Sequence, residues 1–388
     1  MKIGLVCPYN IFKGGGVQEC VLALQNELSK RGHKVYIITP RPRVVPANYD
    51  SFIILVGLAA DVKSPFHTTA QLSANVDSSA LTRLLNEQNF DVLHFHEPWV
   101  PLLSWQILSK SSAANVATFH AKLPETLMSR TIEKVITPYT KSIVKSLNIL
   151  TAVSDAASEY ITSLSLEKPL IIANGIDQSK YNYKKRKKST PSKSIVYVGR
   201  LEKRKGVIYL LKAFALLVSK HPEVTLTLIG DGPDRQKLEL YVTNKKIPNV
   251  KFLGYVEEKV KIDTLARSDV FCSPALYGES FGIVLLEAIA MGAAVVAGDN
   301  PGYSSVMKGV GAQSLVNPKK INGFSDKLET FLYDEDLRKD WQNWAKNYIK
   351  QFNYSLITDQ YEKAYNKAIV QSNKSKNKKP PTRRLIQG

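Results

Sequence analysis

Two carboxylates flank the start of a predicted helix in residues 278–287. Glu279 lies in a Gly-Glu-Ser-Phe-Gly stretch that is typical of a loop, and Glu287 follows eight residues later in an apolar, helix-forming run. Backbone amides at a helix start attract negative charge. Such a junction could use one carboxylate for sugar hydroxyls and the other for a ribose diol. On a helix surface, two carboxylates at this spacing would be unremarkable by themselves.

A cluster of cations follows a predicted strand in residues 199–206, which read Gly-Arg-Leu-Glu-Lys-Arg-Lys-Gly. Ligands gather at the carboxyl ends of strands in open α/β sheets, so a diphosphate could bind there. Arg200 offers a bidentate fork and Lys205 a movable point charge. Together they could neutralise a departing diphosphate, the work that a metal ion does elsewhere. A solvated basic loop explains the same residues.

Three glycines, Gly14, Gly15 and Gly16, follow the first predicted strand and open a helix. Glycines in this position let backbone N–H groups approach a diphosphate at the helix N-terminus. Their spacing is not the GxGxxG of dinucleotide-binding folds, so a flexible loop is the alternative.

The elements that must position these motifs alternate between short apolar runs and longer helical patterns, as repeated βα units do. A chain of 388 residues exceeds the usual size of one hydrophobic core, so two domains are expected. The predicted strands lie at 3–7, 34–39, 92–96, 116–120, 149–153, 170–173, 195–198, 224–229, 251–253, 270–272 and 294–297. The predicted helices lie at 16–31, 206–219 and 282–291 and between 322 and 370. This order predicts an α/β fold with two parallel sheets.

The domain boundaries follow from where the pattern restarts. We expect an N-terminal Rossmann-like domain at 1–183, a basic linker at 184–194 and a C-terminal Rossmann-like nucleotide-sugar domain at 195–354. A last helix at about 355–370 is expected to pack back on the first domain. Residues 371–388 are polar and basic and contain two adjacent prolines, which predicts a disordered tail.

In the order and spacing of its motifs, the chain resembles the GT-B glycosyltransferases of family four, which include phosphatidylinositol mannosyltransferases. The resemblance covers residues 1 to about 370 and rests on VCPY at 6–9, GGVQ at 15–18, HEP at 96–98, ATFH at 117–120, VSD at 153–155 and ESFGIVLLEA at 279–288. It implies two Rossmann-like domains that face each other across a central cleft.

The resemblance also implies roles for individual residues. The implied donor-binding residues are Gly15, Gly16, Arg200, Lys205, Glu279, Phe281, Gly282, Ile283 and Glu287. The implied acceptor-binding residues are Tyr9, Gln18 and His120. Four residues are implied in catalysis, namely His120, Arg200, Lys205 and Glu279. No obligatory cofactor or active-site metal is implied.

The activity implied by the resemblance is transfer of a hexose with retention of anomeric configuration. We expect mannose from GDP-mannose as the donor and a membrane lipid such as phosphatidylinositol as the acceptor. A UDP-glucose-type donor or a soluble glycan acceptor on the same fold stays open. An epimerase on this fold is another alternative.

A formal charge of +19 also invites a nucleic-acid-binding interpretation. Residues 184–193 and 374–384 each hold six Lys or Arg and no acidic residue, so part of the excess is local. The chain has no zinc-finger, homeodomain or RNP-type pattern beside the charge. We therefore expect no nucleic-acid partner.

A basic stripe is predicted on the helical stretch between residues 122 and 148, formed by Arg130, Lys134, Lys141 and Lys145. It could bind anionic lipid at about 1 kcal/mol per basic residue, while a solvated helix packed on the sheet would show the same pattern. The three cysteines have no zinc or disulfide spacing, and no apolar run reaches the roughly 20 residues of a membrane span. We expect a cytoplasmic protein that is peripheral on the inner face of the plasma membrane.

Two weaker metal motifs are present. His94, His96 and His120, with Asp91 or Glu97, could form a cluster, although no fourth-ligand pattern supports zinc. Asp334-Glu335-Asp336 spells a DxD sequence, but its position before a predicted helix favours an ordinary helix cap.

Overall fold

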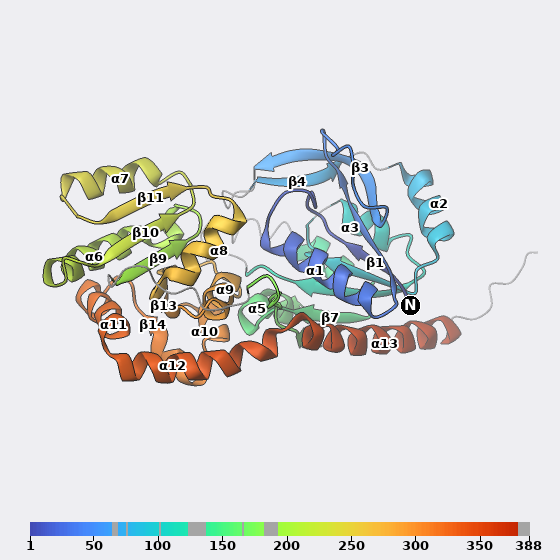
Figure 1. Cartoon of the computed structure of the whole chain (residues 1–388). Helices are drawn as coiled ribbons and strands as arrows, with labels where there is room; N and C mark the ends of the chain where they lie inside the picture. Colours follow the sequence, from blue (N-terminus) through green and yellow to red (C-terminus); the bar gives the residue numbers. More distant parts are fainter. Residues whose placement is uncertain are drawn as a thin grey trace, which may run out of the picture. The chain divides into compact units, whose positions relative to one another are not determined.

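The computed structural model describes residues 1–63, 69–74, 77–100, 102–122, 137–164, 167–181 and 193–378. The chain forms two compact units, each an α/β assembly (Figure 1). The first unit holds residues 1–153, 157–173 and 354–388, and the second holds residues 154–156 and 174–353. Apart from residues 154–156, the second unit starts at Asn174, whereas the predicted N-terminal domain extends to residue 183.

The first unit is built on a sheet of eight strands within the described residues, in the order β4-β3-β2-β1-β5-β6-β7-β8. The strands are β1 (Lys2–Val6), β2 (Lys34–Arg41), β3 (Ile53–Lys63), β4 (Thr69–Ala74), β5 (Val92–His96), β6 (Ala114–Phe119), β7 (Ile149–Ala152) and β8 (Leu170–Ile171). Neighbouring strands are parallel except β3 and β4, which are antiparallel. Every residue of β5 and β6 is buried, as expected for central strands covered on both faces.

Helices of the first unit include α1 (Gly16–Lys30), α2 (Ser78–Gln88), α3 (Leu103–Leu108), most of α5 (Asp155–Leu164) and α13 (Tyr354–Lys378). The buried residues of α1 recur at helical spacing and form one apolar face; they are Cys20, Val21, Leu24, Gln25 and Leu28. This spacing fixes the side of α1 that meets the sheet.

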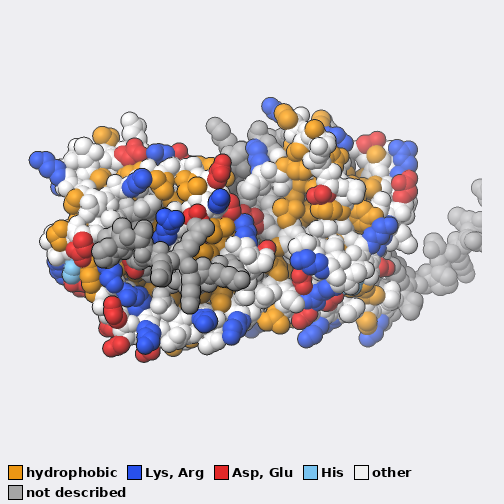
Figure 2. Space-filling view, viewed as in Figure 1, with side chains coloured by type: hydrophobic (Ala, Val, Ile, Leu, Met, Phe, Trp, Pro, Cys, Tyr) orange, Lys and Arg blue, Asp and Glu red, His pale blue; other side chains and the backbone are white. Residues whose placement is uncertain are grey.

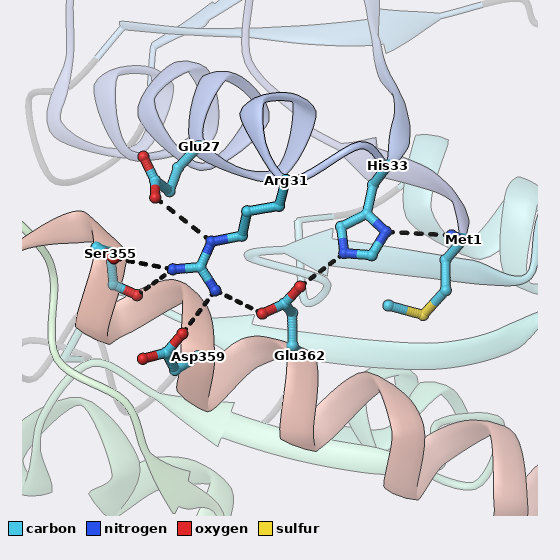
Figure 3. Close-up of polar contacts among 7 residues, drawn as sticks. All are labelled: Met1, Glu27, Arg31, His33, Ser355, Asp359 and Glu362. Carbon is cyan, nitrogen blue, oxygen red and sulfur yellow. Dashed lines mark hydrogen bonds and ion pairs between the residues drawn. The ribbon is translucent and has the colours of Figure 1, made fainter.

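The C-terminal helix α13 is part of the first unit, although the whole second unit precedes it in the chain. It contacts α1, β5, β6 and β7, and it buries Tyr361 and Tyr365 in the first unit's core. Figure 3 shows the polar side of this contact, where Arg31, the C-cap residue of α1, reaches Asp359 (2.6 Å) and Glu362 (2.5 Å) of α13. His33 Nε2 lies 2.6 Å from the other oxygen of Glu362.

The second unit has six strands within the described residues, all parallel, in the order β11-β10-β9-β12-β13-β14. They are β9 (Ser194–Val198), β10 (Thr225–Ile229), β11 (Val250–Gly254), β12 (Val270–Ser273), β13 (Ala294–Gly298) and β14 (Leu315–Val316). The helices are α6 (Val207–Lys220), α7 (Arg235–Asn244), α8 (Glu258–Arg267), α9 (Ile283–Ala290), α10 (Pro301–Val306), α11 (Ile321–Tyr333) and α12 (Glu335–Tyr348), with short 3-10 turns at Lys203–Lys205, Gly309–Ser314 and Ile349–Phe352.

The predicted α/β class with two parallel sheets is confirmed. Each strand predicted from an apolar run is present, with ends shifted by a few residues at most. Three strands of the structure were not predicted, namely β3, β4 and β14. The unpredicted helices are α2, α3, α5, α7, α8 and α10. Strand β3 begins with the apolar run Ile53–Val56, so the sequence did carry a signal for it. Ile53 and Val56 are buried in the first unit.

The predicted disordered tail was wrong for residues 371–378, which continue α13. Ser, Asn, Lys and Gln are tolerated in helices, and the helix-breaking pair Pro380-Pro381 comes later. Residues 379–388 and most of the predicted linker at 184–194 lie outside the described residues.

The predicted cap at Asp334 is confirmed, because its Oδ1 accepts a hydrogen bond from the backbone N–H of Leu337 (2.9 Å) at the start of α12. No helix in the described part of the chain combines the length and apolar character that a membrane crossing requires.

Candidate active site

The basic loop of the second unit connects β9 to α6. Arg200 follows β9 and is about half exposed, with its Nε 4.0 Å from a Glu202 oxygen. Residues Lys203–Lys205 form a 3-10 turn, and Gly206 ends it with φ 68°. A Cβ at Gly206 would lie 2.2 Å from the carbonyl oxygen of Pro274. This position therefore needs glycine, both for its backbone angle and for the close approach of the β12 end.

Glu279 receives two cations from this loop. Its Oε1 lies 2.7 Å from Lys205 Nζ and 2.8 Å from Arg204 Nη1, and its side chain is 11% exposed. Arg204 also contacts Glu202 Oε1 at 2.8 Å. Burial alone would lower the pKa of Arg204, but Glu279 and Glu202 raise it above the ordinary value. The structure thus brings together the predicted residues Lys205 and Glu279.

Arg204 is a functional candidate that the sequence analysis missed. It lies in the same basic run as Arg200 and Lys205, so the run itself was the available signal. Only the fold shows that Arg204 points to Glu279. Within the described residues, the ion pair of Arg200 is with Glu202, and neither carboxylate of the predicted pair contacts it.

Glu287, the second carboxylate of the pair, is buried in α9 and already has partners. Tyr181 donates a hydrogen bond to its Oε1 at 2.8 Å, and Lys261 Nζ lies 3.1 Å from its Oε2. Glu258 joins the group through Tyr181 (2.7 Å) and Lys261 (3.0 Å). Burial would raise the pKa of Glu258, but hydrogen bonds from Tyr181, Lys180 and Lys261 lower it to about 2. Glu258 is therefore ionised at neutral pH.

The start of α9 lies between the two carboxylates. Gly282 caps it with φ 100°, and a Cβ there would lie 2.7 Å from the ring of Tyr303. No side chain of the described residues caps this helix end. Phe281 is buried with its ring edge toward Phe352, and Ile283 is half-buried. Any ligand contact from Phe281 therefore has to come from its backbone, as the sequence analysis predicted for a helix N-terminus.

The predicted acceptor residues lie in the first unit. Tyr9 follows β1, and its carbonyl oxygen accepts a hydrogen bond from Thr39 Oγ1 at 2.7 Å. Gly15 and Gly16 start α1, where Gly15 is the cap residue and Gly16 is exposed. Gln18 is half-buried, and its Nε2 lies 3.5 Å from the carbonyl oxygen of Asn10.

His120 follows β6 and is held from two sides. Its Nε2 lies 2.9 Å from Nδ1 of His96, and its backbone N–H donates to Glu97 Oε1 at 2.5 Å. Trp99 donates to the other oxygen of Glu97. Burial raises the pKa of Glu97 to about 7, against the lowering effect of these hydrogen bonds. His120 is thus oriented by a buried acid whose charge changes near neutral pH.

His94 does not join a three-histidine cluster with His96 and His120. Its Nδ1 hydrogen-bonds Tyr365 (2.8 Å) and its Nε2 hydrogen-bonds Thr118 (2.6 Å), so both ring nitrogens are used inside the core. Burial lowers the pKa of His94 to about 3. The metal alternative with His94 as a ligand was therefore wrong.

The predicted membrane stripe is described only in part. Lys141 and Lys145 are exposed, and Ile143 between them is buried. Arg130 and Lys134 lie outside the described residues.

Comparison with known proteins identifies the fold and the family. Residues 14–180 match the model of "Glycosyltransferase Family 4", and residues 179–348 match that of "Glycosyl transferases group 1". A phosphatidyl-myo-inositol mannosyltransferase of Mycolicibacterium smegmatis is 31% identical, with 94% of this chain and 93% of the relative covered. One of Propionibacterium freudenreichii is 32% identical, with 79% of each covered.

Among solved structures, sucrose-phosphate synthase of Thermosynechococcus elongatus superposes with a TM-score of 0.74 at 17% identity, with 95% of this chain and 99% of that chain covered. Anabaena HepE in complex with UDP-glucose superposes with a TM-score of 0.69 at 17% identity, with 97% and 100% covered. The two α/β units are those of a GT-B glycosyltransferase. The chain belongs to glycosyltransferase family 4 and is a hexosyltransferase similar to phosphatidyl-myo-inositol mannosyltransferases.

Proposed function

We propose that this glycosyltransferase moves mannose from GDP-mannose to a membrane lipid such as phosphatidylinositol, with retention of anomeric configuration and without an obligatory metal or other cofactor. The donor site consists of Gly15, Gly16, Arg200, Lys205, Glu279, the backbone of Phe281, Gly282 and Ile283, and Glu287. The acceptor site consists of Tyr9, Gln18 and His120. The protein works at the inner face of the plasma membrane.

The observation that carries the proposal is the contact of Lys205 with Glu279. Each group is a partner suited to one part of a sugar nucleotide, and without a donor they neutralise each other. A diphosphate competes for Lys205 and sugar hydroxyls compete for Glu279, so the ion pair can be exchanged for two ligand contacts at little cost in unpaired charge. Arg204 stays beside Glu279 as a second cationic partner during that exchange.

The chemical step needs stabilisation of the leaving diphosphate. Lys205 and Arg200 supply positive charge where negative charge develops, which is the work otherwise done by a divalent ion. Retention follows if the acceptor hydroxyl attacks from the side that the diphosphate leaves. The leaving phosphate oxygen can then take the proton of the acceptor hydroxyl. His120 orients that hydroxyl and the donor sugar.

The acceptor assignment rests on the relatives and on exposed cations. Relatives that are 31% and 32% identical are phosphatidyl-myo-inositol mannosyltransferases. Lys141 and Lys145 are exposed basic residues in the region assigned to the membrane surface. Arg130 and Lys134, the other two residues of the proposed stripe, lie outside the described residues. An anionic bilayer attracts such residues through a field that salt screens within about 10 Å at 0.1 M.

No nucleic-acid partner is proposed. On the face drawn in Figure 2, Lys and Arg side chains are interspersed with Asp and Glu side chains instead of forming one continuous basic band. Phosphate backbones favour a continuous stripe of cations. A UDP-glucose-type donor is the second candidate, since a structure similar in fold contains UDP-glucose. A soluble glycan is the alternative acceptor, and the transfer assay below includes it.

The test is isothermal titration of the protein with GDP, UDP and ADP, followed by transfer assays with the matching sugar nucleotides. Vesicles with and without phosphatidylinositol and a soluble glycan serve as acceptors. Selective GDP binding and mannose transfer to phosphatidylinositol are expected. Preference for UDP would replace the donor, transfer to the soluble glycan alone would replace the acceptor, and turnover of the donor without any acceptor would indicate an epimerase.

A further inference from the structure

A cysteine and two histidines come together inside the first unit. Cys20 lies on α1, His96 ends β5 and His120 follows β6, and one ligand atom from each lies within 4.8 Å of the others. All three residues are buried. Thiolate sulfur and imidazole nitrogen are the ligands that zinc prefers, with metal–ligand distances of about 2.0–2.3 Å. The three atoms are close enough for one ion to bind them after small side-chain movements.

A second, independent observation concerns His96. Its Nε2 is buried and has no hydrogen-bond partner among the described residues, while its Nδ1 lies 2.9 Å from His120 Nε2. A buried polar atom without a partner costs about 1–3 kcal/mol. When Nδ1 carries the ring proton, it donates to His120 Nε2, and His96 Nε2 has a lone pair that a cation would satisfy. If the cation binds His120 through Nε2, it replaces this hydrogen bond between the two rings.

The surroundings can balance the charge of a cation. Glu97 is buried beside the cluster and accepts a hydrogen bond from the backbone N–H of His120. An ordinary cysteine thiol has a pKa of about 8.5 and is mostly protonated at neutral pH. An ion that binds Cys20 replaces this proton and releases it to the solvent, so binding strengthens as the pH rises.

We propose that Cys20, His96 and His120 form a binding site for a thiophilic cation, Zn²⁺ in particular, with the fourth coordination position left to water or an anion. Such three-ligand sites keep an open position. The site is not needed for glycosyl transfer. If His120 orients the acceptor, as in the proposed function, then Zn²⁺ inhibits transfer by occupying His120; the metal site itself does not depend on that function.

The test uses the untagged full chain, kept reduced with a non-thiol reductant. Titration with Co²⁺ is expected to give a thiolate-to-cobalt charge-transfer band that saturates at one equivalent. Titration with Zn²⁺ should abolish this band and release about one proton per ion. Absence of the band, or saturation without proton release, would overturn the assignment of Cys20 as a ligand.

Variants assign the band to this site. Cys20→Ser should remove the band and weaken Zn²⁺ binding at least tenfold, whereas Cys272→Ser, which changes a buried cysteine of the second unit, should leave both unchanged. Cys20→His provides a nitrogen ligand and should restore Zn²⁺ binding without the band, which protects the test against a misfolded serine variant. Zn²⁺ affinity equal to wild type in a folded Cys20→Ser protein would refute the site.

The consequence for transfer is measured separately. Zn²⁺ should inhibit the wild-type enzyme reversibly, and a chelator should restore activity, while Cys20→Ser should transfer without Zn²⁺ and resist inhibition. Binding of Zn²⁺ with no inhibition would count against the role of His120 in the proposed function and would leave the metal site standing. If an active wild-type enzyme bound no Zn²⁺, the metal site would be refuted and the role of His120 in the proposed function would be unaffected.

Discussion

Lys205 Nζ lies 2.7 Å from Glu279 Oε1, so two residues that are distant in sequence neutralise each other at one edge of the second unit. Both side chains are mostly buried, so water screens their attraction less than in an exposed salt bridge, while the loss of hydration of both charges offsets part of this gain. A donor that separates them has to supply a negative group for Lys205 and hydroxyl donors for Glu279. A sugar diphosphate supplies both.

Replacement of Lys205 should therefore affect turnover far more than folding. We expect Lys205→Ala to lower kcat/KM by about 10²–10³-fold, the usual effect of removing one group that stabilises developing charge. Glu279 keeps Arg204 as a partner, so the melting temperature should change little. Lys203→Ala is the matched control, because Lys203 is exposed in the same 3-10 turn. Wild-type kcat/KM in Lys205→Ala would remove Lys205 from the donor site.

The hydrogen bond between Tyr181 and Glu287 leads to a prediction of tighter, instead of weaker, ligand binding. If Glu287 binds the ribose diol, the hydrogen bond from Tyr181 has to be released or shared when nucleotide binds. Tyr181→Phe removes this competitor and leaves Lys261 in place. We expect nucleoside diphosphate to bind about 2–10-fold more tightly, the equivalent of one neutral hydrogen bond.

Titration calorimetry measures that change, with Tyr333→Phe as the control because Tyr333 donates to Glu223 elsewhere in the second unit. A weaker affinity in Tyr181→Phe would mean that Tyr181 positions Glu287 for the ligand instead of competing with it.

The sequence predicted most of the sheet framework because central parallel strands are continuous apolar runs between turn signals. Strands β5 and β13 illustrate this, since all of their residues are buried. The motifs of Lys205 and Glu279 lie in the loops that precede α6 and α9, and the structure brings these two residues into contact. Their roles in donor binding stay predictions. The edge strand β4 was missed because Thr69–Ala74 contains no continuous apolar run. Strand β3 was missed although residues 53–56 form one.

The partners of the predicted residues could not be predicted. Tyr181 and Glu287 are 106 positions apart, and only the folded second unit brings them together. Cys20 has no metal-site spacing in the sequence, and its proximity to His96 and His120 depends on how α1 packs on the sheet. Spacing in the sequence reveals metal ligands that share one helix, strand or loop. Cys20, His96 and His120 lie on or after three different elements, so their spacing gives no such signal.

The contact of α1 with α13 should stabilise the first unit. Arg31 binds Asp359, Glu362 and the Ser355 carbonyl oxygen in one place, so no shorter or single-point cation can replace it (Figure 3). We expect Arg31→Ala to lower the unfolding free energy by about 1–2 kcal/mol and to speed amide hydrogen exchange in α13. Lys367→Ala, on the exposed face of α13, should change neither. Unaltered exchange in Arg31→Ala would show that Tyr361 and Tyr365 alone hold the helix.

Acid should weaken the first unit through His94. Burial lowers the pKa of His94 to about 3, whereas an unfolded histidine has a pKa of about 6.5. Between these values the unfolded chain binds one more proton than the folded one. The unfolding free energy therefore falls as the pH drops below about 6.5, by up to roughly 1.4 kcal/mol per pH unit for this group.

Glu97 partly offsets this loss, because its pKa is raised to about 7 and its protonated form is favoured in the folded state. Comparison with a variant isolates the histidine. His94→Gln loses the ring contacts with Tyr365 and Thr118, so it should melt at a lower temperature than wild type at pH 7. Because glutamine cannot ionise, the difference in melting temperature between the two proteins should narrow from pH 6.5 to pH 5. His221→Gln, in the second unit, should not narrow the difference in this way. A constant gap for His94→Gln across that range would show that His94 does not remain neutral in the folded core.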